Sequence, residues 1–303
     1  MSVSKMHSDE VETDSALVKQ LLISQFPQWA ELPIKPVLSA GTDNALYKLG
    51  EDMVVRLPRI EKAVNHIDKE MHWLPRLAPL LPVAIPTPLV KGTRSSNYPF
   101  QWSIYRWLKG EIPVVDDIKE PQLLTKDLAK FITALHNVHL EEGPSAKRGV
   151  PLSTQDSSTR KAIEGLRGVI DTEAATALWN EALYTSEWRG ELVWVHGDLL
   201  PMNLLTLKGR LSAVIDWGGV GVGDPACDLI IAWTLLSSDM RSIFRNILQV
   251  DDATWARGRG WAFSIALIQL PYYQDTNLVL ADNARHVIKE ILTEYKTAKS
   301  LRC

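Results

Sequence analysis

The order of strand-like and helix-like segments is the feature of this sequence that most constrains its fold. Short apolar runs separated by glycines occupy residues 34–57, and an alternating run covers 101–107. Apolar residues at helical spacing dominate from residue 121 onward, apart from one strand-rich stretch at 192–215. Because strands come first and helices later, without regular alternation, the sequence predicts an α+β chain of two unequal lobes.

The N-terminal part should begin with a helix and continue as a small antiparallel meander. Apolar spacing predicts a helix over residues 15–26, with Asp14 or Ser15 as its N-cap. A second helix begins near Val64, and Pro75 should kink or end it before a stiff, proline-rich connector. Strands are expected at 34–38, 45–49, 53–57 and 101–107.

The remaining elements are mostly helices. Glycine and lysine at 208–209 mark the turn of a hairpin inside the strand-rich stretch. The predicted helices cover 121–140, 159–170, 174–187, 225–236, 254–270 and 277–295, and the predicted strands cover 192–195, 204–207 and 211–215.

Composition excludes several classes of partner. The 303 residues are 46% hydrophobic, enough for a large core, and 33 basic against 36 acidic residues leave no basic stripe for nucleic acid. The most apolar stretches, 228–236 and 261–270, are shorter than the roughly 20 residues that cross a bilayer. The N-terminus does not resemble a signal peptide. Two cysteines, Cys227 and Cys303, suit a reducing cytoplasm. We expect a cytoplasmic protein without nucleic acid or membrane partners.

One polar loop concentrates residues suited to phosphoryl transfer. It follows the apolar strand at 192–195 and contains Asp198 and, five positions later, Asn203. Phosphoryl transfer needs a carboxylate to orient a hydroxyl and accept its proton, together with oxygen ligands for Mg²⁺. The next apolar strand ends at Asp216. Hairpin pairing should bring Asn203 and Asp216 to roughly 7 Å, at about 3.3 Å per residue, close enough to share a metal ion.

These motifs resemble the aminoglycoside phosphotransferase family, a branch of the protein-kinase-like fold. His196-Gly197-Asp198 followed by Asn203 is similar to the catalytic loop of that family. Ile215-Asp216-Trp217, with Gly223-Asp224-Pro225 and Asp228-Leu229, is similar to its metal-binding segment and the start of the next helix. The resemblance implies that Asp198 is the base, that Asn203 and Asp216 bind Mg²⁺, and that His196 and Asp224 give structural support.

The resemblance extends into the N-terminal lobe. Arg56 takes the position of the cation that contacts the α- and β-phosphates, and Glu70 that of the carboxylate that pairs with it. The C=O of Arg106 and the N–H of Leu108 fall where the family binds adenine. Residues 39–44 take the place of the phosphate loop but lack its repeated glycines.

The resemblance implies a bilobal protein-kinase-like fold and a small-molecule kinase. Residues 1–107 would form the nucleotide-binding lobe and residues 108–303 the catalytic and acceptor-binding lobe, with ATP, or GTP, and Mg²⁺ between them. The acceptor would be a hydroxyl of an aminoglycoside-like antibiotic or a related metabolite. Residues 237–303 carry seven acidic against nine basic residues, so a sugar, an amino alcohol or a macrolide is equally open. The sequence leaves the oligomeric state unknown.

Other interpretations stay open at this point. Asp224 and Asp228 flank Pro225 and suit a helix start and bracing of the lobe, with substrate contact as the alternative. His136 and His139 form at most half of a metal site. Two other functions are a metal-dependent hydrolase using His196-x-Asp198 and a catalytically silent nucleotide-binding module. The aromatic candidates for an acceptor pocket are Trp255, Trp261, Tyr272 and Tyr273.

Overall fold

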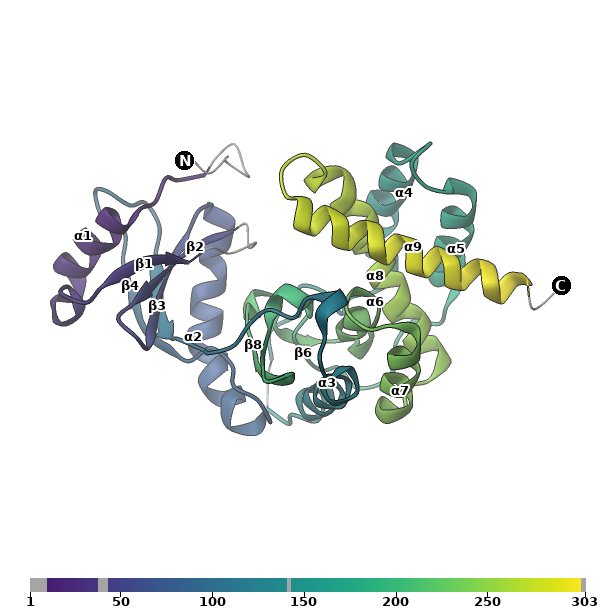
Figure 1. Cartoon of the computed structure of the whole chain (residues 1–303), viewed down its shortest axis with the longest axis horizontal. Helices are drawn as coiled ribbons and strands as arrows, with labels where there is room; N and C mark the ends of the chain where they lie inside the picture. The colour runs from purple at the N-terminus through teal and green to yellow at the C-terminus, as the bar shows by residue number, and fades with distance from the viewer. Residues whose placement is uncertain (1–9, 38–42, 141–142, 301–303) are drawn as a thin grey trace. The chain divides into compact units, whose positions relative to one another are not determined.

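The chain divides into two compact units, each described here by itself. The computed structural model describes residues 10–37, 43–140 and 143–300 (Figure 1). Unit 1 comprises Met1–Glu111 with Ser212–Gly218, and unit 2 comprises Ile112–Leu211 with Gly219–Cys303. Strands dominate the first and helices the second, which confirms the α+β class. Among the described residues, every helix is too short or too polar to span a bilayer.

Unit 1 is built on a five-stranded antiparallel sheet with the strand order β1-β2-β3-β5-β4. The predicted meander and the strand after it are confirmed. The strands are β1 (Ile34–Val37), β2 (Asn44–Leu49), β3 (Met53–Pro58), β4 (Pro88–Gly92) and β5 (Trp102–Arg106). Helices α1 (Ser15–Gln25) and α2 (Asn65–Leu77) lie on opposite faces of this sheet (Figure 1).

The face of the sheet toward α1 holds the hydrophobic core of unit 1. Strand residues alternate between the two faces, so Tyr47 and Val55 pack against Leu21 and Leu22 of α1, and all four are buried. The Asp14 carboxylate accepts a hydrogen bond of 2.7 Å from the Leu17 N–H and caps α1, as the sequence predicted. The opposite face is thereby left for polar residues and α2.

Prolines lie at the end of α2 and at the start of a further strand, β4. Helix α2 ends at Leu77, two residues after Pro75, close to the end that this proline predicted. The connector expected around Pro88 contains a strand, β4. Proline is tolerated there because Pro88 is the first residue of a strand at the sheet edge, where no ladder N–H is needed from it.

Unit 2 contains most of the helices. Helix α8 lies at its centre and packs against α4, α5 and α9. The helices are α3 (Pro121–His136), α4 (Asp156–Gly165), α5 (Thr172–Tyr184), α6 (Ile231–Thr234), α7 (Ser238–Leu248), α8 (Asp252–Tyr273) and α9 (Leu278–Ser300). The strands β6 (Val193–Val195) and β9 (Gly221–Gly223) pair antiparallel. Strands β7 (Leu204–Leu207) and β8 (Arg210–Val214) form the predicted hairpin.

The hairpin turn has the conformation that its residues favour, and two helical regions differ from the prediction. Lys208 and Gly209 have φ of 52° and 75°, the left-handed conformations that a tight hairpin turn requires. The single helix predicted over 225–236 is instead a 3₁₀ helix, η8 (Pro225–Ile230), followed by the short α6. Helix α7 was not predicted, although the spacing of Met240, Phe244 and Ile247 is helical.

Two neighbouring residues of α1 allow a matched stability test. Leu22→Ala should lower the free energy of unfolding by about 2–5 kcal/mol, because it leaves a cavity in a fully buried position. Ile23→Ala is the control, since that side chain is 56% exposed. Urea unfolding followed by circular dichroism measures both, and equal effects of the two substitutions would contradict the packing described.

Candidate active site

One buried carboxylate holds the loop that follows β6. Asp228, in η8, is fully buried, and its Oδ2 and Oδ1 accept hydrogen bonds from the N–H groups of His196 and Gly197 at 3.0 and 2.9 Å. His136 of α3 lies with Nε2 3.2 Å from Asp228 Oδ2. Two bonds to one carboxylate fix the backbone at the start of the loop. Asp228 is therefore a bracing residue in this structure.

The loop itself requires glycine at position 197. Gly197 has a φ of 74°, and an added Cβ would lie 2.9 Å from the carbonyl oxygen of Gly219. The next N–H, that of Asp198, donates to His196 Nδ1 at 3.2 Å, and Asn203 Nδ2 donates to the Asp198 carbonyl at 2.8 Å. The structure thus brings His196, Asp198 and Asn203 together in one short turn. Their roles in catalysis stay predictions.

The Asp198 carboxylate is paired with a residue that the sequence did not single out. Arg148 Nη1 donates to Asp198 Oδ1 and, at 2.9 Å, to the Gly197 carbonyl. Burial would raise the pKa of Asp198, but the positive charges of Arg148 and Lys147 outweigh it and hold that pKa below its ordinary value. These positive charges therefore favour the ionised form of Asp198.

Asp224 has a structural role that its sequence neighbours suggested. It caps η8 through a hydrogen bond of 2.9 Å from the Ala226 N–H. Arg257 of α8 holds both carboxylate oxygens, with Nε 2.6 Å from Oδ2 and Nη2 3.2 Å from Oδ1. Both side chains are buried, so this is a desolvated, bidentate ion pair.

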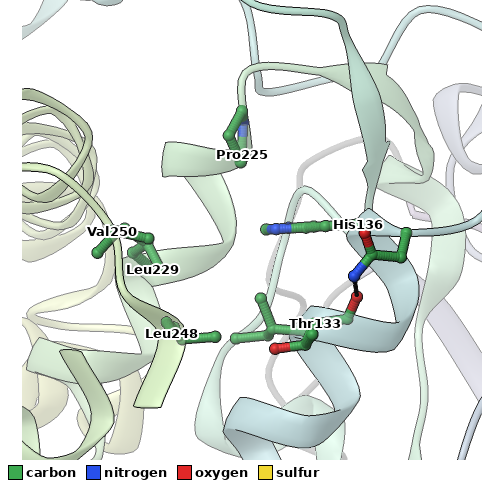
Figure 2. A pocket seen from close by; sticks show the side chains of 8 residues that line it. Thr133, His136, Pro225, Leu229, Leu248 and Val250 are labelled. Carbon is green, nitrogen blue, oxygen red and sulfur yellow. Dashed lines mark hydrogen bonds between the residues drawn. The ribbon is translucent and has the colours of Figure 1, made fainter. Parts of the chain in front are cut away.

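A pocket of about 140 Å³ lies beside the Asp228 anchor. Figure 2 shows Thr133 and His136 from α3 facing Leu229 of η8 and the end of α7 across it. Most of its lining is apolar, and His136 is the ring that contacts Asp228. Within residues 10–37, 43–140 and 143–300, no group of three or more His, Cys, Asp or Glu side chains is placed to hold a metal ion.

In unit 1, Arg56 lies on the sheet face toward α2. Its Nη1 is 2.8 Å from both carboxylate oxygens of Glu70, and the Tyr105 hydroxyl donates to Glu70 Oε2. With its amide oxygen turned toward Arg56, Asn44 accepts from Nη2 and Nε at 3.1 and 3.2 Å. Glu70 is only 1% exposed. The ion pair expected between Arg56 and Glu70 is therefore present, and it fixes the direction of the guanidinium.

Asp216 belongs to the same cluster. Its Oδ1 lies 3.4 Å from Arg56 Nη2, its side chain is 48% exposed, and its φ is 59°. Burial would lower the pKa of Arg56, but the negative charges of Glu70 and Asp216 raise it, so the guanidinium stays charged. Unit 1 thus brings Arg56, Glu70 and Asp216 together. The sharing of one metal ion by Asp216 and Asn203 stays a prediction.

The candidate adenine contacts lie just after β5. Arg106 ends that strand, its N–H donates to the Thr87 carbonyl at 2.9 Å, and its side chain pairs with Asp52. For the Leu108 N–H, the described part of the chain provides no acceptor, and its contact with adenine stays a prediction. The expected phosphate loop lies mostly outside the described residues, since 38–42 are not among them.

The aromatic residues considered for an acceptor pocket do not form one group. Trp261 is buried in the core around α8. Trp255 packs on Trp233, with ring centroids 4.7 Å apart. Tyr272 and Tyr273 contact each other at the end of α8, and Tyr272 is 54% exposed. Their role in acceptor binding stays a prediction.

Comparison with known families decides what kind of protein carries this site. The model of the phosphotransferase enzyme family matches residues 36–261, most of the chain. The chain belongs to this phosphotransferase family. Among curated proteins it is 24% identical over 187 residues to the uncharacterized protein YcbJ of Bacillus subtilis (strain 168), with 60% of this chain and 57% of that protein covered.

A second curated relative of this chain is the aminoglycoside 3'-phosphotransferase of Streptomyces fradiae. It is 33% identical over 121 residues, which cover 37% of this chain and 44% of the relative. The chain therefore spans about half the length of the curated relatives that it matches.

Similar solved structures show the fold of this chain. The GDP and kanamycin complex of APH(2″)-IIIa is 19% identical, covers 94% of this chain and 99% of that one, and gives a TM-score of 0.75. The apoenzyme of macrolide 2'-phosphotransferase MphH from Brachybacterium faecium is 20% identical, covers 90% and 97%, and gives 0.61. The predicted kinase-like fold, with a β-rich N-terminal lobe and a larger helical C-terminal lobe, is confirmed.

The buried pair of Asp224 and Arg257 provides a stability test. Arg257→Ala should lower the free energy of unfolding by about 3–5 kcal/mol, because it leaves a buried carboxylate without its cation. The double substitution with Asp224→Ala should recover part of that loss. Arg245→Ala, which removes the partner of the exposed Asp252, is the control and should have a much smaller effect in urea unfolding. Similar losses for both arginines would contradict the assignment.

Proposed function

We propose that this phosphotransferase moves the γ-phosphoryl group of ATP, or GTP, to a hydroxyl of a small molecule, with Mg²⁺, in the cytoplasm. The observation that supports it most is the cluster of Arg56, Glu70 and Asp216. A charged guanidinium whose direction is fixed by a buried carboxylate, next to an exposed carboxylate, suits phosphate groups and a cation bound to them.

The nucleotide would be held by residues of unit 1. Arg56 would contact the α- and β-phosphates, as its fork of donors matches phosphate oxygens, while Glu70 and Tyr105 keep it in place. Arg106 and Leu108 would contact adenine through their backbone. Two similar structures contain GDP and ADP, which supports a nucleotide donor without deciding between adenine and guanine.

The donor atoms available fit magnesium. Asp216 offers a half-exposed carboxylate, and Asn203 uses its Nδ2 for the Asp198 carbonyl, so its amide oxygen is oriented away from that bond. One carboxylate and one amide oxygen are the hard ligands that Mg²⁺ prefers, with phosphate oxygens and water completing the shell. When bound, the ion would neutralise charge on the transferred phosphoryl group.

Asp198 would act as the base. The acceptor hydroxyl oxygen forms a bond to the γ-phosphorus, the bond from that phosphorus to the bridging oxygen breaks, and the nucleoside diphosphate leaves. The hydroxyl proton passes to the Asp198 carboxylate. Because the transition state of such transfers is loose, the proton moves late, and a carboxylate of low pKa is adequate. His196 would support the loop through its bond to the Asp198 N–H.

The acceptor is proposed at the level of chemical class. Similar structures include complexes with kanamycin and gentamicin and two macrolide 2'-phosphotransferases. We propose an aminoglycoside-like antibiotic or a related metabolite bearing a free hydroxyl.

Removing the proposed base tests the reaction. Asp198→Ala should lower the rate of phosphoryl transfer by at least about 100-fold, since it removes a general base, and should keep ATP binding. ADP release with kanamycin, erythromycin and simple sugars as acceptors measures transfer, and calorimetry measures binding. Asp282→Ala, an exposed carboxylate paired with Arg285, is the control and should leave both unchanged. Near-normal transfer by Asp198→Ala would refute the assignment.

Asp216 is tested through the metal dependence of nucleotide binding. Asp216→Asn should remove the increase in ATP affinity that Mg²⁺ gives the wild type, because an amide replaces the charged ligand. Calorimetric titrations with ATP, with and without MgCl₂, measure this difference. If Asp216→Asn retains the full Mg²⁺ dependence, Asp216 is not a metal ligand.

A further inference from the structure

The segment that carries Arg148 is fixed along β9. The N–H of Ala146 donates to the Val222 carbonyl at 3.1 Å, and the N–H of Val222 donates to the Pro144 carbonyl at 2.7 Å. The N–H of Lys147 donates to the Gly219 carbonyl at 3.1 Å. These bonds pair the backbone of the segment with β9 and with the residue two positions before it. The Arg148 side chain therefore starts from a backbone that is held in place.

The segment ends at Gly149, which is also fixed by a backbone hydrogen bond. Its carbonyl accepts a hydrogen bond of 2.8 Å from the Asp224 N–H, and its φ is 96°. An added Cβ would lie 3.1 Å from the Cα of Gly223, so glycine allows the close approach of the two backbones. The position of Arg148 is thus determined from both sides.

One nitrogen of the Arg148 guanidinium, Nη1, makes the hydrogen bonds of this side chain to the described residues. Nη1 binds Asp198 Oδ1 and the Gly197 carbonyl, and the side chain is 17% exposed. Nε and Nη2 have no acceptor in the part of the chain that the structure describes. On Asp198, Oδ1 is held by Arg148, and Oδ2 has no donor among the described residues. One carboxylate oxygen is fixed and the other is left for a hydroxyl.

Two positive charges act on the Asp198 carboxylate. Arg148 contacts it, and the adjacent Lys147 adds the second charge. Several carboxylates of unit 2 are already paired with basic side chains. These ion pairs include Asp224 with Arg257, Glu290 and Glu294 with Arg241, Asp252 with Arg245, and Asp282 with Arg285.

We propose that Arg148 positions Asp198 and, with Lys147, selects an acceptor that carries no positive charge beside its reactive hydroxyl. This inference rests on the proposed function, because it places the acceptor hydroxyl at Asp198. Arg148 acts through the Asp198 carboxylate, which it orients, and through the repulsion of cationic groups on the acceptor. Of the two acceptor classes proposed above, this inference favours the related metabolite over the aminoglycoside: a neutral or anionic hydroxyl compound, such as a sugar derivative without free amino groups.

Binding of a matched pair of ligands tests the selection. Kanamycin and fully N-acetylated kanamycin share a scaffold and differ in charge. Arg148→Gln should bind kanamycin about fivefold more tightly than the wild type does, because a repelling charge is gone, with little change for the acetylated compound. Arg148→Lys should behave like the wild type. Arg167→Gln, which removes a surface partner of Glu164, is the control. Calorimetry with the ATP-loaded 303-residue chain measures the affinities.

Circular dichroism shows whether Arg148→Gln folds. If it does not fold, a second variant tests the selection. Lys147→Gln leaves the ion pair of Arg148 intact and should also bind kanamycin more tightly than the wild type. The selection is overturned if the folded variants bind kanamycin with the affinity of the wild type. It is also overturned if neither the wild type nor the variants bind kanamycin.

Kinetics test the positioning role and separate it from the proposed function. Arg148→Gln should lower kcat at least about tenfold with an unchanged KM for ATP, since it misplaces the base without touching the nucleotide, and Arg148→Lys should recover part of kcat. An unchanged kcat in Arg148→Gln overturns the positioning role. If the wild type transfers phosphate to no acceptor, the proposed function fails, while the kanamycin affinities still decide the inference on charge.

Discussion

The candidate catalytic loop depends on the hydrogen bonds that its backbone makes to the buried carboxylate of Asp228. A fully buried charge is unfavourable unless hydrogen bonds replace its water, and here the N–H groups of His196 and Gly197 do so, with His136 beside them. The two backbone bonds determine where the loop leaves β6. The left-handed turn at Gly197 and the direction of Asp198 follow from that starting point. The anchor is remote in sequence from the loop and adjacent to it in space.

Unit 1 uses the same principle around a different carboxylate. Glu70 is almost completely buried and accepts hydrogen bonds from Arg56 and from the Tyr105 hydroxyl. Burial and the negative charge of Glu70 raise the pKa of Tyr105, so the phenol stays neutral and remains a donor. A buried acid therefore fixes the direction of a basic side chain in unit 1, as Asp228 fixes the start of a loop in unit 2. Removing such an acid would leave its partners without a fixed direction.

The sequence predicted this site where the chemistry depends on residues close together in the chain. The order of His196, Asp198, Asn203 and Asp216 after apolar strands was sufficient to locate the two loops, and the family resemblance singled out Arg56 on the third predicted strand. Arg148 escaped prediction because its segment has no periodicity and is held by backbone bonds to β9, a strand of three residues that was itself not predicted. The edge strand β4 was not predicted because its first residue is a proline, and proline usually argues against a strand. Tertiary contacts, and not local preference, decided these cases.

The backbone at Asp216 adds an argument that the sequence alone does not contain. Among the described residues other than glycine, Lys208, Asp216 and Gln249 have positive φ. Lys208 lies in the hairpin turn and Gln249 caps the end of α7, so both have an ordinary structural reason for this conformation. Asp216 follows β8 and lies in neither setting, and aspartate is one of the residues other than glycine that adopt the left-handed region most readily. The conformation places its carboxylate beside Arg56, so the backbone turn and the ion pair together set the direction of this side chain.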